Sequence, residues 1–278
     1  MKHTRTLKVG IIGLGAIGRE VANRIESGKV GEAQLVSLLC RDKNKNLSLS
    51  IEQSAHFKSI ITDDINDLLA AQPDIVIEAA GQPSLKHYGG MVLAKGIDLL
   101  VSSIGLFTDD QVLSQFIETA DSSGAKILLS TGALPAVDWM SAASLSEVKN
   151  ISITQTKPVK SWKNTPAEEF VDLHSLQDAT CFFEGTARES ANLFPKSSNI
   201  SAMLALATIG LDQTKVKLVA DPTSDIMNTY IDFDSSVGKL QVNWQGVPSI
   251  ANPSTSADVP LAIVKCIRNL SSPINYGA

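Results

Sequence analysis

The sequence has few cysteines, and they are poorly placed for structural cross-links. Cys40, Cys181 and Cys266 are far apart, odd in number and include no C-x-x-C pair. This pattern argues against a disulfide framework and against a structural zinc site. We therefore expect a reducing compartment, the cytoplasm, and no bound metal.

Long apolar runs are also missing. No uncharged stretch of about 20 apolar residues is present, so we expect no membrane span. The basic N-terminus "MKHTRTLKVGIIG" ends in a short apolar run that glycine interrupts. Such a run is typical of a buried strand rather than of a signal peptide.

Positive charge is in slight deficit. Lys and Arg number 24 against 29 Asp and Glu, which gives a net charge of −5. A mildly acidic protein has no broad electrostatic attraction to nucleic acid or to an anionic membrane, so we expect a small-molecule ligand. With 44% hydrophobic and 19% charged residues in 278, the chain is expected to fold as a packed protein of two domains.

Strand and helix patterns alternate over residues 1–131. The runs typical of buried strands are "LKVGIIG", "AQLVSLL", "DIVIEAAG", "IDLLVSS" and "AKILLSTGA". The segments between them have apolar residues at helical spacing, and Thr108 is expected to cap one helix. This alternation predicts an α/β fold, a Rossmann-type doubly wound parallel sheet with helices on both faces.

The pattern changes over residues 132–251, where a second and smaller α+β domain is expected. The predicted strands are "ISITQTK", "ATCFFEG", "VKLVAD", "TYIDFDS" and "KLQVNW". Several of them alternate apolar and polar residues, and one helix, "NISAMLALATIG", lies among them. A further helix within residues 252–278 is expected to return to the first domain.

A glycine motif, G-x-G-x-x-G, lies between the first predicted strand and the first helix. In a dinucleotide site the first glycine permits a tight turn, the second lets the backbone approach the pyrophosphate, and the third lets the helix pack close to the strand. The alternative is a plain strand–turn–helix of an unrelated α/β fold. The expected cofactor contacts here are Gly13, Gly15, Ala16, Ile17 and Gly18, with Ala80 and Gly81 after the third strand.

The end of the second strand bears on the choice of nicotinamide cofactor. NAD sites usually place an acid there, bonded to the ribose 2′-hydroxyl, but this sequence has Cys40 followed by Arg41. A guanidinium suits a 2′-phosphate, so we expect NADP(H) to be preferred, with NAD(H) possible. In the alternative, Asp42 fills the NAD role in a shifted register and Arg41 is a solvated surface charge.

The segment "FFEGTARESANLFPKSSNISAMLALATIGLD", followed by "VKLVADP", resembles the L-aspartate dehydrogenase family. The resemblance covers nearly the whole chain and recurs in "STGALPAVDWMSA", "TQTKPV" and "NPSTSA". Members of that family join a Rossmann domain to an α+β domain and interconvert L-aspartate and iminosuccinate with NAD(P). The resemblance implies a small dicarboxylic or amino acid substrate, and with the alternating strands it implies a homodimer through the second domain's sheet.

Carried over residue by residue, the resemblance implies several site residues. Thr131, Gly132 and Ala133 match a loop beside the nicotinamide, Asn199 matches a cofactor-binding asparagine, Asn252 begins a loop that lines the cofactor, and Lys157 matches a basic position beside the active cleft. Plainer interpretations remain: a domain-joining turn at Thr131–Gly132, a helix N-cap at Asn199 and a solvated Lys157. Glu184, Arg188 and Glu189 also match, but as a structural ion-pair cluster.

The family's catalytic histidine is absent from the matching strand. An ungapped alignment puts Thr229 in its place, whereas a slip of one residue puts Tyr230 there; we favour the ungapped version because a slip would turn every side chain to the other face. Substitute proton donors are Tyr230, if Lys157 lowers its pKa, and His174. We expect His3, His56 and His87 to be surface or hydrogen-bonded residues.

The sequence thus predicts an NAD(P)-dependent amino acid dehydrogenase of the aspartate dehydrogenase type, with Thr229, Tyr230 and Lys157 as candidate catalytic residues. Two alternatives stay open. One is a dehydrogenase for another amino or oxo acid with a different proton donor. The other is an NAD(P)-binding sensor or partner protein with little catalysis.

Overall fold

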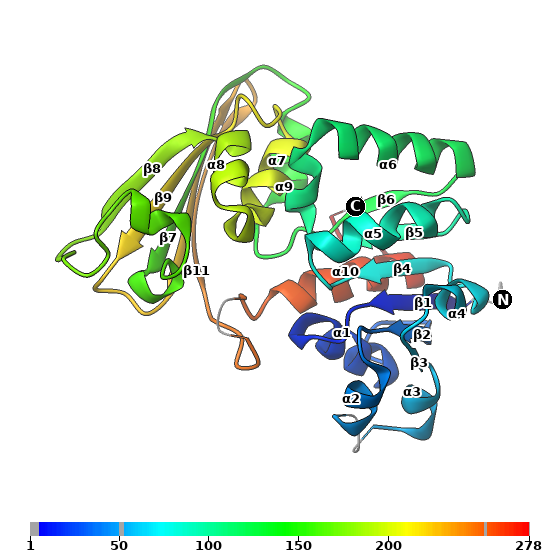
Figure 1. Ribbon diagram of the computed structural model, residues 1–278. Coiled ribbons are helices and arrows are strands. Elements are labelled where there is room, and N and C mark those ends of the chain that lie inside the picture. Colours follow the sequence, from blue (N-terminus) through cyan, green and yellow to red (C-terminus); the bar gives the residue numbers. More distant parts are fainter. Residues whose placement is uncertain (1–5, 50–52, 253–254, 278) are drawn as a thin grey trace. The chain divides into compact units, whose positions relative to one another are not determined.

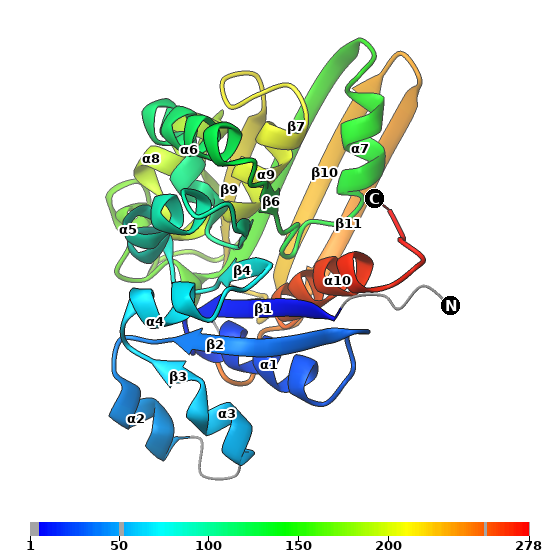
Figure 2. The same cartoon turned by 90° about the vertical axis from the view of Figure 1, so that its right-hand side faces the viewer.

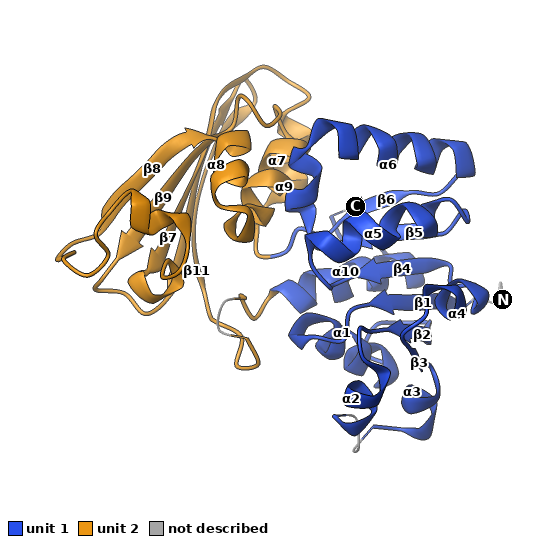
Figure 3. Cartoon of the chain, viewed as in Figure 1, with its two compact units in different colours: residues 1–132, 259–278 blue, residues 133–258 orange. Residues whose placement is uncertain are grey.

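The computed structural model describes residues 6–49, 53–252 and 255–277. His3 and part of the loop 252–256 lie outside them. The chain divides into two compact units, shown in Figures 1 and 3. Unit 1 comprises Met1–Gly132 and Val259–Ala278, and unit 2 comprises Ala133–Asp258.

Unit 1 is built on a parallel sheet of six strands. In spatial order these are β3 (Ile61–Thr62), β2 (Ala33–Leu39), β1 (Leu7–Ile12), β4 (Ile75–Glu78), β5 (Asp98–Val101) and β6 (Ile127–Leu129). The strand order reverses direction between β1 and β4, as in the dinucleotide-binding folds. The expected Rossmann-type sheet is therefore confirmed, and each strand predicted in this half is present.

The helices of unit 1 pack on this sheet through apolar side chains. They are α1 (Ala16–Glu26), α2 (Lys43–Ser48), α3 (Ala55–Ser59), α4 (Ile65–Ala70), α5 (Gln82–Leu93), α6 (Asp110–Ser123) and α10 (Val259–Ser271), with a 3-10 turn, η1 (Ile104–Thr108). Val9 and Ile11 of β1 share one core cluster with Val21 of α1 and Ile263 of α10. Burying one such side chain contributes about 1.5–3 kcal/mol.

The C-terminal helix α10 lies against α1, as Figure 1 shows. Its last residue, Ser271, donates a hydrogen bond of 2.7 Å to the carbonyl of Val30, which follows α1. The two ends of the chain therefore build one core.

Two local predictions in unit 1 need correction. Thr108 does not cap α6: its hydroxyl donates to the Gly105 carbonyl inside η1, and Asp109 caps the helix by accepting from the backbone of Gln111 and Val112. The short helices α2 and α3 were not predicted.

Unit 2 contains a mixed sheet of five strands. In spatial order these are β11 (Gly238–Gly246), β10 (Met227–Ser235), β7 (Val148–Pro158), β9 (Lys215–Asp221) and β8 (Thr180–Thr186), and the β7–β9 pair is parallel. Its helices are α7 (Val137–Ala143), α8 (Ala187–Leu193) and α9 (Asn199–Ala207), with the 3-10 turns η2 (Val159–Ser161), η3 (Pro166–Glu169) and η4 (Pro195–Ser197). The prediction of a single helix in this half is wrong, because α7 and α8 form as well.

The two faces of the second sheet differ in chemistry. One face buries Ile153 and Phe233. Trp139 of α7, the helix drawn over this sheet in Figure 2, packs edge-on against Phe233 with ring centroids 5.6 Å apart. The other face has polar cross-strand rows, Thr154–Tyr230–Asn243 and Ser152–Asp232–Gln241.

Candidate active site

The carboxyl ends of parallel strands meet at one edge of the unit 1 sheet, where ligands bind in open α/β folds. A cavity of about 660 Å³ opens there, lined by residues that follow the neighbouring strands β3, β2, β1 and β4. Its lining includes Gly13, Gly15, Cys40, Arg41, Lys45, Ala79 and Ala80. Four of the predicted cofactor contacts, Gly13, Gly15, Arg41 and Ala80, thus share one cavity.

The three glycines of the motif have different steric environments. Gly13 has φ +103°, and an added Cβ would come within 2.7 Å of the Ala79 carbonyl oxygen. At Gly18 an added Cβ would meet the Gly13 carbonyl oxygen at 1.9 Å, so only glycine lets α1 start this close to the strand. Gly15 instead faces open space.

This geometry fits a dinucleotide. Gly15 is the N-cap residue of α1, no acidic residue occupies the first turn, and Ala16 and Ile17 begin the helix. The open space beside Gly15 lets a pyrophosphate approach the backbone N–H groups and the positive end of the helix dipole.

Glu78 organises the neighbouring loops, although no motif in the sequence singles it out. It is fully buried at the end of β4. Its Oε1 accepts from the backbone N–H groups of Ala80 and Gly81, both at 2.8 Å, and from the Ser103 hydroxyl at 2.9 Å. Its Oε2 accepts from the Ser103 backbone at 3.0 Å. The carboxylate therefore joins the loop after β4 to the loop after β5.

The cavity wall after β2 has one thiol and two cations. Cys40 is buried, its thiol donates to the Thr62 carbonyl, and burial raises the pKa of that thiol. Arg41 is exposed and lines the cavity with Lys45. Asp42 also lines it, but its carboxylate accepts the Lys45 backbone N–H at 2.9 Å and caps α2.

The loop after β6 contains two residues with left-handed backbone. Gly132 and Ala136 both have φ +58°. For alanine this conformation costs about 1–3 kcal/mol, and strain of this kind clusters at functional sites. Thr131 and Gly132 end the first segment of unit 1, and Ala133 begins unit 2.

In unit 2, Thr229 and Tyr230 lie on opposite faces of β10. Thr229 is 8% exposed and lies, with Ile231 and Phe233, on the apolar face of the sheet, here called the covered face. Tyr230, on the other face, is 38% exposed. Thr229 pairs directly with Gln155 of β7 and with Trp244 of β11. The two alignments of the sequence thus place the histidine position on different faces.

Lys157 follows Gln155 by two residues and lies on the same face of β7. Its Nζ donates to the Ser197 hydroxyl at 2.9 Å and lies 4.8 Å from the ring centroid of the buried Trp162. Desolvation lowers the pKa of Lys157 to about 8, because burial disfavours the charged form. The alternative of a solvated strand lysine does not fit these contacts.

Other candidates lie in loops and at helix ends. Asn199 is the first residue of α9, and Ser198 is its N-cap. The side-chain amide of Asn252 donates to the Thr255 hydroxyl at 3.1 Å. His174 is exposed, and His56 contacts the Leu35 carbonyl at 3.1 Å.

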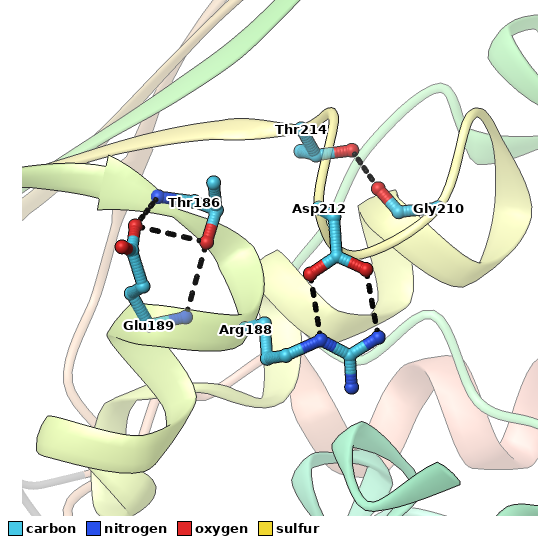
Figure 4. A network of polar contacts seen from close by, with 6 residues as sticks. All are labelled: Thr186, Arg188, Glu189, Gly210, Asp212 and Thr214. Atoms are coloured by element: carbon cyan, nitrogen blue, oxygen red, sulfur yellow. Dashed lines mark hydrogen bonds and ion pairs between the residues drawn. The ribbon is translucent and has the colours of Figure 1, made fainter.

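The charged residues near α8 form structural contacts, drawn in Figure 4. Arg188 makes a two-pronged ion pair with Asp212, at 2.6 and 2.9 Å. Thr186 and Glu189 form a capping box at the start of α8. These contacts agree with the interpretation of a structural ion-pair cluster.

Among residues 6–49, 53–252 and 255–277, no group of three or more His, Cys, Asp or Glu side chains is placed to hold a metal ion. In the same part of the chain, no helix has the length and apolar character needed to cross a bilayer.

Comparison with known proteins shows which family the chain matches. A family model described as "Aspartate dehydrogenase, C-terminal" matches residues 138–270, and one described as "Homoserine dehydrogenase, NAD binding domain" matches residues 13–130. The sequence is 32% identical over 259 residues to the L-aspartate dehydrogenase of Brucella anthropi, covering 93% of this chain and 94% of that protein. It is 33% identical over 271 residues to that of Ralstonia pickettii, covering 97% and 99%.

The fold agrees with these matches. A crystal structure of aspartate dehydrogenase from Thermotoga maritima aligns with a TM-score of 0.72 at 24% identity, over 97% of this chain and 99% of that one. The chain belongs to the L-aspartate dehydrogenase family and is an NAD(P)-dependent oxidoreductase of that type.

Proposed function

We propose that the protein oxidises L-aspartate to iminosuccinate, or reduces iminosuccinate in the reverse direction. The observation that carries this is family membership over nearly the whole chain, together with the open glycine loop. Gly13 and Gly15 would hold the pyrophosphate of a nicotinamide dinucleotide, and the bound nicotinamide would accept or donate the hydride. In oxidation, the hydride leaves the carbon that bears the amine and the nitrogen gives up a proton.

Lys157 is the proposed proton carrier. No histidine lies in the strand where the family resemblance implies one, and Thr229 occupies the matching position on the covered face. Threonine can hold a water molecule by hydrogen bonds but cannot take its proton near neutral pH. Lys157, on the same face as Thr229, has a pKa of about 8, so it exchanges a proton under mildly alkaline conditions.

Tyr230 has a weaker case within this proposal. It points to the polar face of the sheet, away from Thr229 and Lys157. We therefore assign the histidine position to Thr229, as in the ungapped alignment.

NADP(H) is the proposed preferred cofactor. Arg41 and Lys45 give the cavity wall two cations where a 2′-phosphate would lie, and no acid occupies the Cys40 position. The Asp42 carboxylate already caps α2, which speaks against the alternative that it binds a ribose hydroxyl of NAD.

We also propose a cytoplasmic homodimer. The proposal follows from the family resemblance, and its interface would be the outer face of the second sheet, where half-buried Thr154 and exposed Tyr230 lie in one cross-strand row. The three cysteines are free, which suits a reducing compartment.

A substrate panel tests the reaction. Aspartate and other amino and oxo acids are offered with each cofactor, and absorbance of the reduced nicotinamide is followed. We expect aspartate to be turned over, slowly at pH 7. Turnover of a different acid alone would favour the alternative dehydrogenase, which the missing histidine supports. Tight cofactor binding without any turnover would favour a sensor.

A further inference from the structure

We infer that Gln155 and Trp244 form a carboxylate-binding pair on either side of Thr229. They are specificity residues for an anionic substrate, and neither residue was singled out from the sequence. The inference rests on the proposed function, because it names how that site would recognise a dicarboxylic acid.

The register of the second sheet brings the three side chains into one row. Thr229 of β10 is directly opposite Gln155 of β7 and directly opposite Trp244 of β11. Directly paired residues of antiparallel strands share a face, with Cβ atoms about 4.5–5.5 Å apart. Gln155 and Trp244 therefore flank Thr229 on the covered face.

Both flanking side chains present donors without acceptors. Gln155 is only 2% exposed, and its Nε2 has no hydrogen-bond partner within the described residues. The Trp244 Nε1 is also buried and unpaired there. Buried polar groups are nearly always satisfied in native proteins, so two orphaned donors in one row indicate a missing ligand acceptor.

The surrounding residues add a further unpaired polar group and a positive charge to this row. The Ser256 hydroxyl is a third buried group without a partner in the described part of the chain. A Cβ on Gly246 would lie 3.1 Å from that hydroxyl and 3.6 Å from the Trp244 Nε1, so the glycine leaves both polar groups uncrowded. Lys157 adds a cation two residues along β7 from Gln155.

The unpaired N–H donors of Gln155 and Trp244 suit a carboxylate group as the ligand. The indole N–H can only donate, and the amide Nε2 offers two N–H groups. Asp232 and Asp234, the carboxylates of β10, alternate onto the other face, so none repels an anion here. Donors to a charged acceptor form the stronger class of hydrogen bond, which suits a carboxylate of a small dicarboxylic acid.

The test removes each donor while keeping its shape. Gln155→Leu and Trp244→Phe are compared with the parent, with Gln245→Leu and Trp139→Phe as matched controls. Succinate, which cannot be oxidised at an amine, is titrated into the NADPH-loaded enzyme by calorimetry, with propionate as a monocarboxylate comparison. Aspartate kinetics, NADPH affinity and thermal melting are measured on the same samples.

We expect the parent to bind succinate more tightly than propionate. Each donor variant should weaken succinate binding by about tenfold or more, since one hydrogen bond to a charged group is lost. KM for aspartate should rise more than kcat falls, NADPH affinity should not change, and the controls should behave like the parent. Melting should not fall for Gln155→Leu, because that variant removes an unsatisfied buried amide.

The outcomes separate this inference from the proposed reaction. If aspartate is not turned over but the donor variants bind succinate more weakly than the parent, the carboxylate-binding pair is supported and the proposed reaction fails. If the folded donor variants bind succinate as the parent does, the pair is overturned whatever the turnover. A parent that binds neither succinate nor propionate also overturns it.

Discussion

At the scale of single residues, Lys157 combines a positive charge with a poorly solvated position. Its ammonium group has a hydroxyl and an indole ring as neighbours, and only desolvation acts on its pKa. Desolvation of the charged lysine raises the free energy of the folded state, whereas the lysine stays hydrated in the unfolded chain. The charge therefore lowers the free energy of unfolding. The property that suits Lys157 to its proposed role as proton carrier therefore also lowers the stability of the folded protein.

Lys157→Met should stabilise the protein at pH 7 by about 1–3 kcal/mol, because a unit of pKa corresponds to about 1.4 kcal/mol. Below pH 8 both states of the parent are protonated and the full cost applies. Between about 8 and 10.5 only the unfolded parent keeps the proton, so the parent's free energy of unfolding rises with pH and the variant's advantage shrinks. Urea unfolding across this range measures the effect. An advantage that does not depend on pH would contradict the desolvation argument.

Thr229→His should raise aspartate oxidation, most of all at pH 7. With a pKa of about 8, only about a tenth of Lys157 is the neutral base at that pH. An imidazole titrates lower and should recover about tenfold or more of the two to four decades that a general base supplies. Initial rates at pH 7 and pH 9 measure it.

The control for that variant is Tyr230→Phe, on the other face of β10, which should leave the rate near that of the parent. Fast, pH-independent oxidation by the unmodified protein would show that another residue is the base.

At the scale of elements, the loops after β1, β4 and β5 are organised by contacts that span the sequence. Glycine provides the close approach of α1 to the loop after β1, and the Glu78 carboxylate fixes the loops after β4 and β5. A fully buried carboxylate with four donors is worth more than an average hydrogen-bonded group, since hydrogen bonds to charged groups contribute about 1.5–3 kcal/mol each.

Glu78→Gln should lower the free energy of unfolding by about 2–4 kcal/mol and weaken cofactor binding. The new amide brings N–H groups against the backbone N–H groups of Ala80 or Ser103. Chemical denaturation and NADPH titration measure the two effects. Glu184→Gln, which removes an exposed ion pair with Lys217, is the control and should change stability by less than about 1 kcal/mol. An unchanged NADPH affinity would separate Glu78 from the cofactor loops.

Arg41→Ala should weaken NADPH binding by about tenfold while changing NADH binding little, because only NADPH has the 2′-phosphate for a guanidinium to bind. Fluorescence titration with both reduced cofactors measures the ratio. Lys43→Ala, a neighbouring cation that does not line the cavity, should leave the ratio unchanged. Equal losses for both cofactors would contradict the assignment.

At the scale of the whole molecule, the sequence predicted the parts that depend on composition and short-range pattern. The strands of unit 1, apart from the two-residue strand β3, were found because buried parallel strands are continuous apolar runs. The helices α2, α3, α7 and α8 have only five to seven residues, too few turns for a periodic signal. Thr108 and Asp109 are adjacent residues of capping type, and the choice between them depends on η1.

In the candidate site, too, the sequence predicted the residues that are neighbours along the chain but not those that tertiary structure brings together. The glycine loop was visible because its residues are neighbours in the sequence. Gln155, Thr229 and Trp244 meet only through strand register across three strands, so no local pattern joins them. The burial of Lys157 depends on Trp162 and Ser197, whose positions likewise follow from tertiary packing.

The protein should be a dimer in solution, with a mass about twice 29.6 kDa. The outer face of the second sheet has hydrogen-bonding rows such as Thr154–Tyr230–Asn243, and Thr154→Arg should disrupt a partner's approach there. Light scattering at micromolar concentration measures the mass of the parent and of the Thr154→Arg variant. A monomeric parent would end the homodimer proposal.

The docking of α10 on α1 has a consequence for synthesis on the ribosome. Unit 2 is continuous in sequence, from Ala133 to Asp258, whereas unit 1 needs residues from both ends of the chain. The nascent chain therefore has all of unit 2 before Ile263 and Ile267 exist to complete the core beside Val21. Until the ribosome has made residues 259–271, the nucleotide-binding unit lacks the side chains of α10 in its core. The unit whose first residues are made earliest is therefore completed after unit 2.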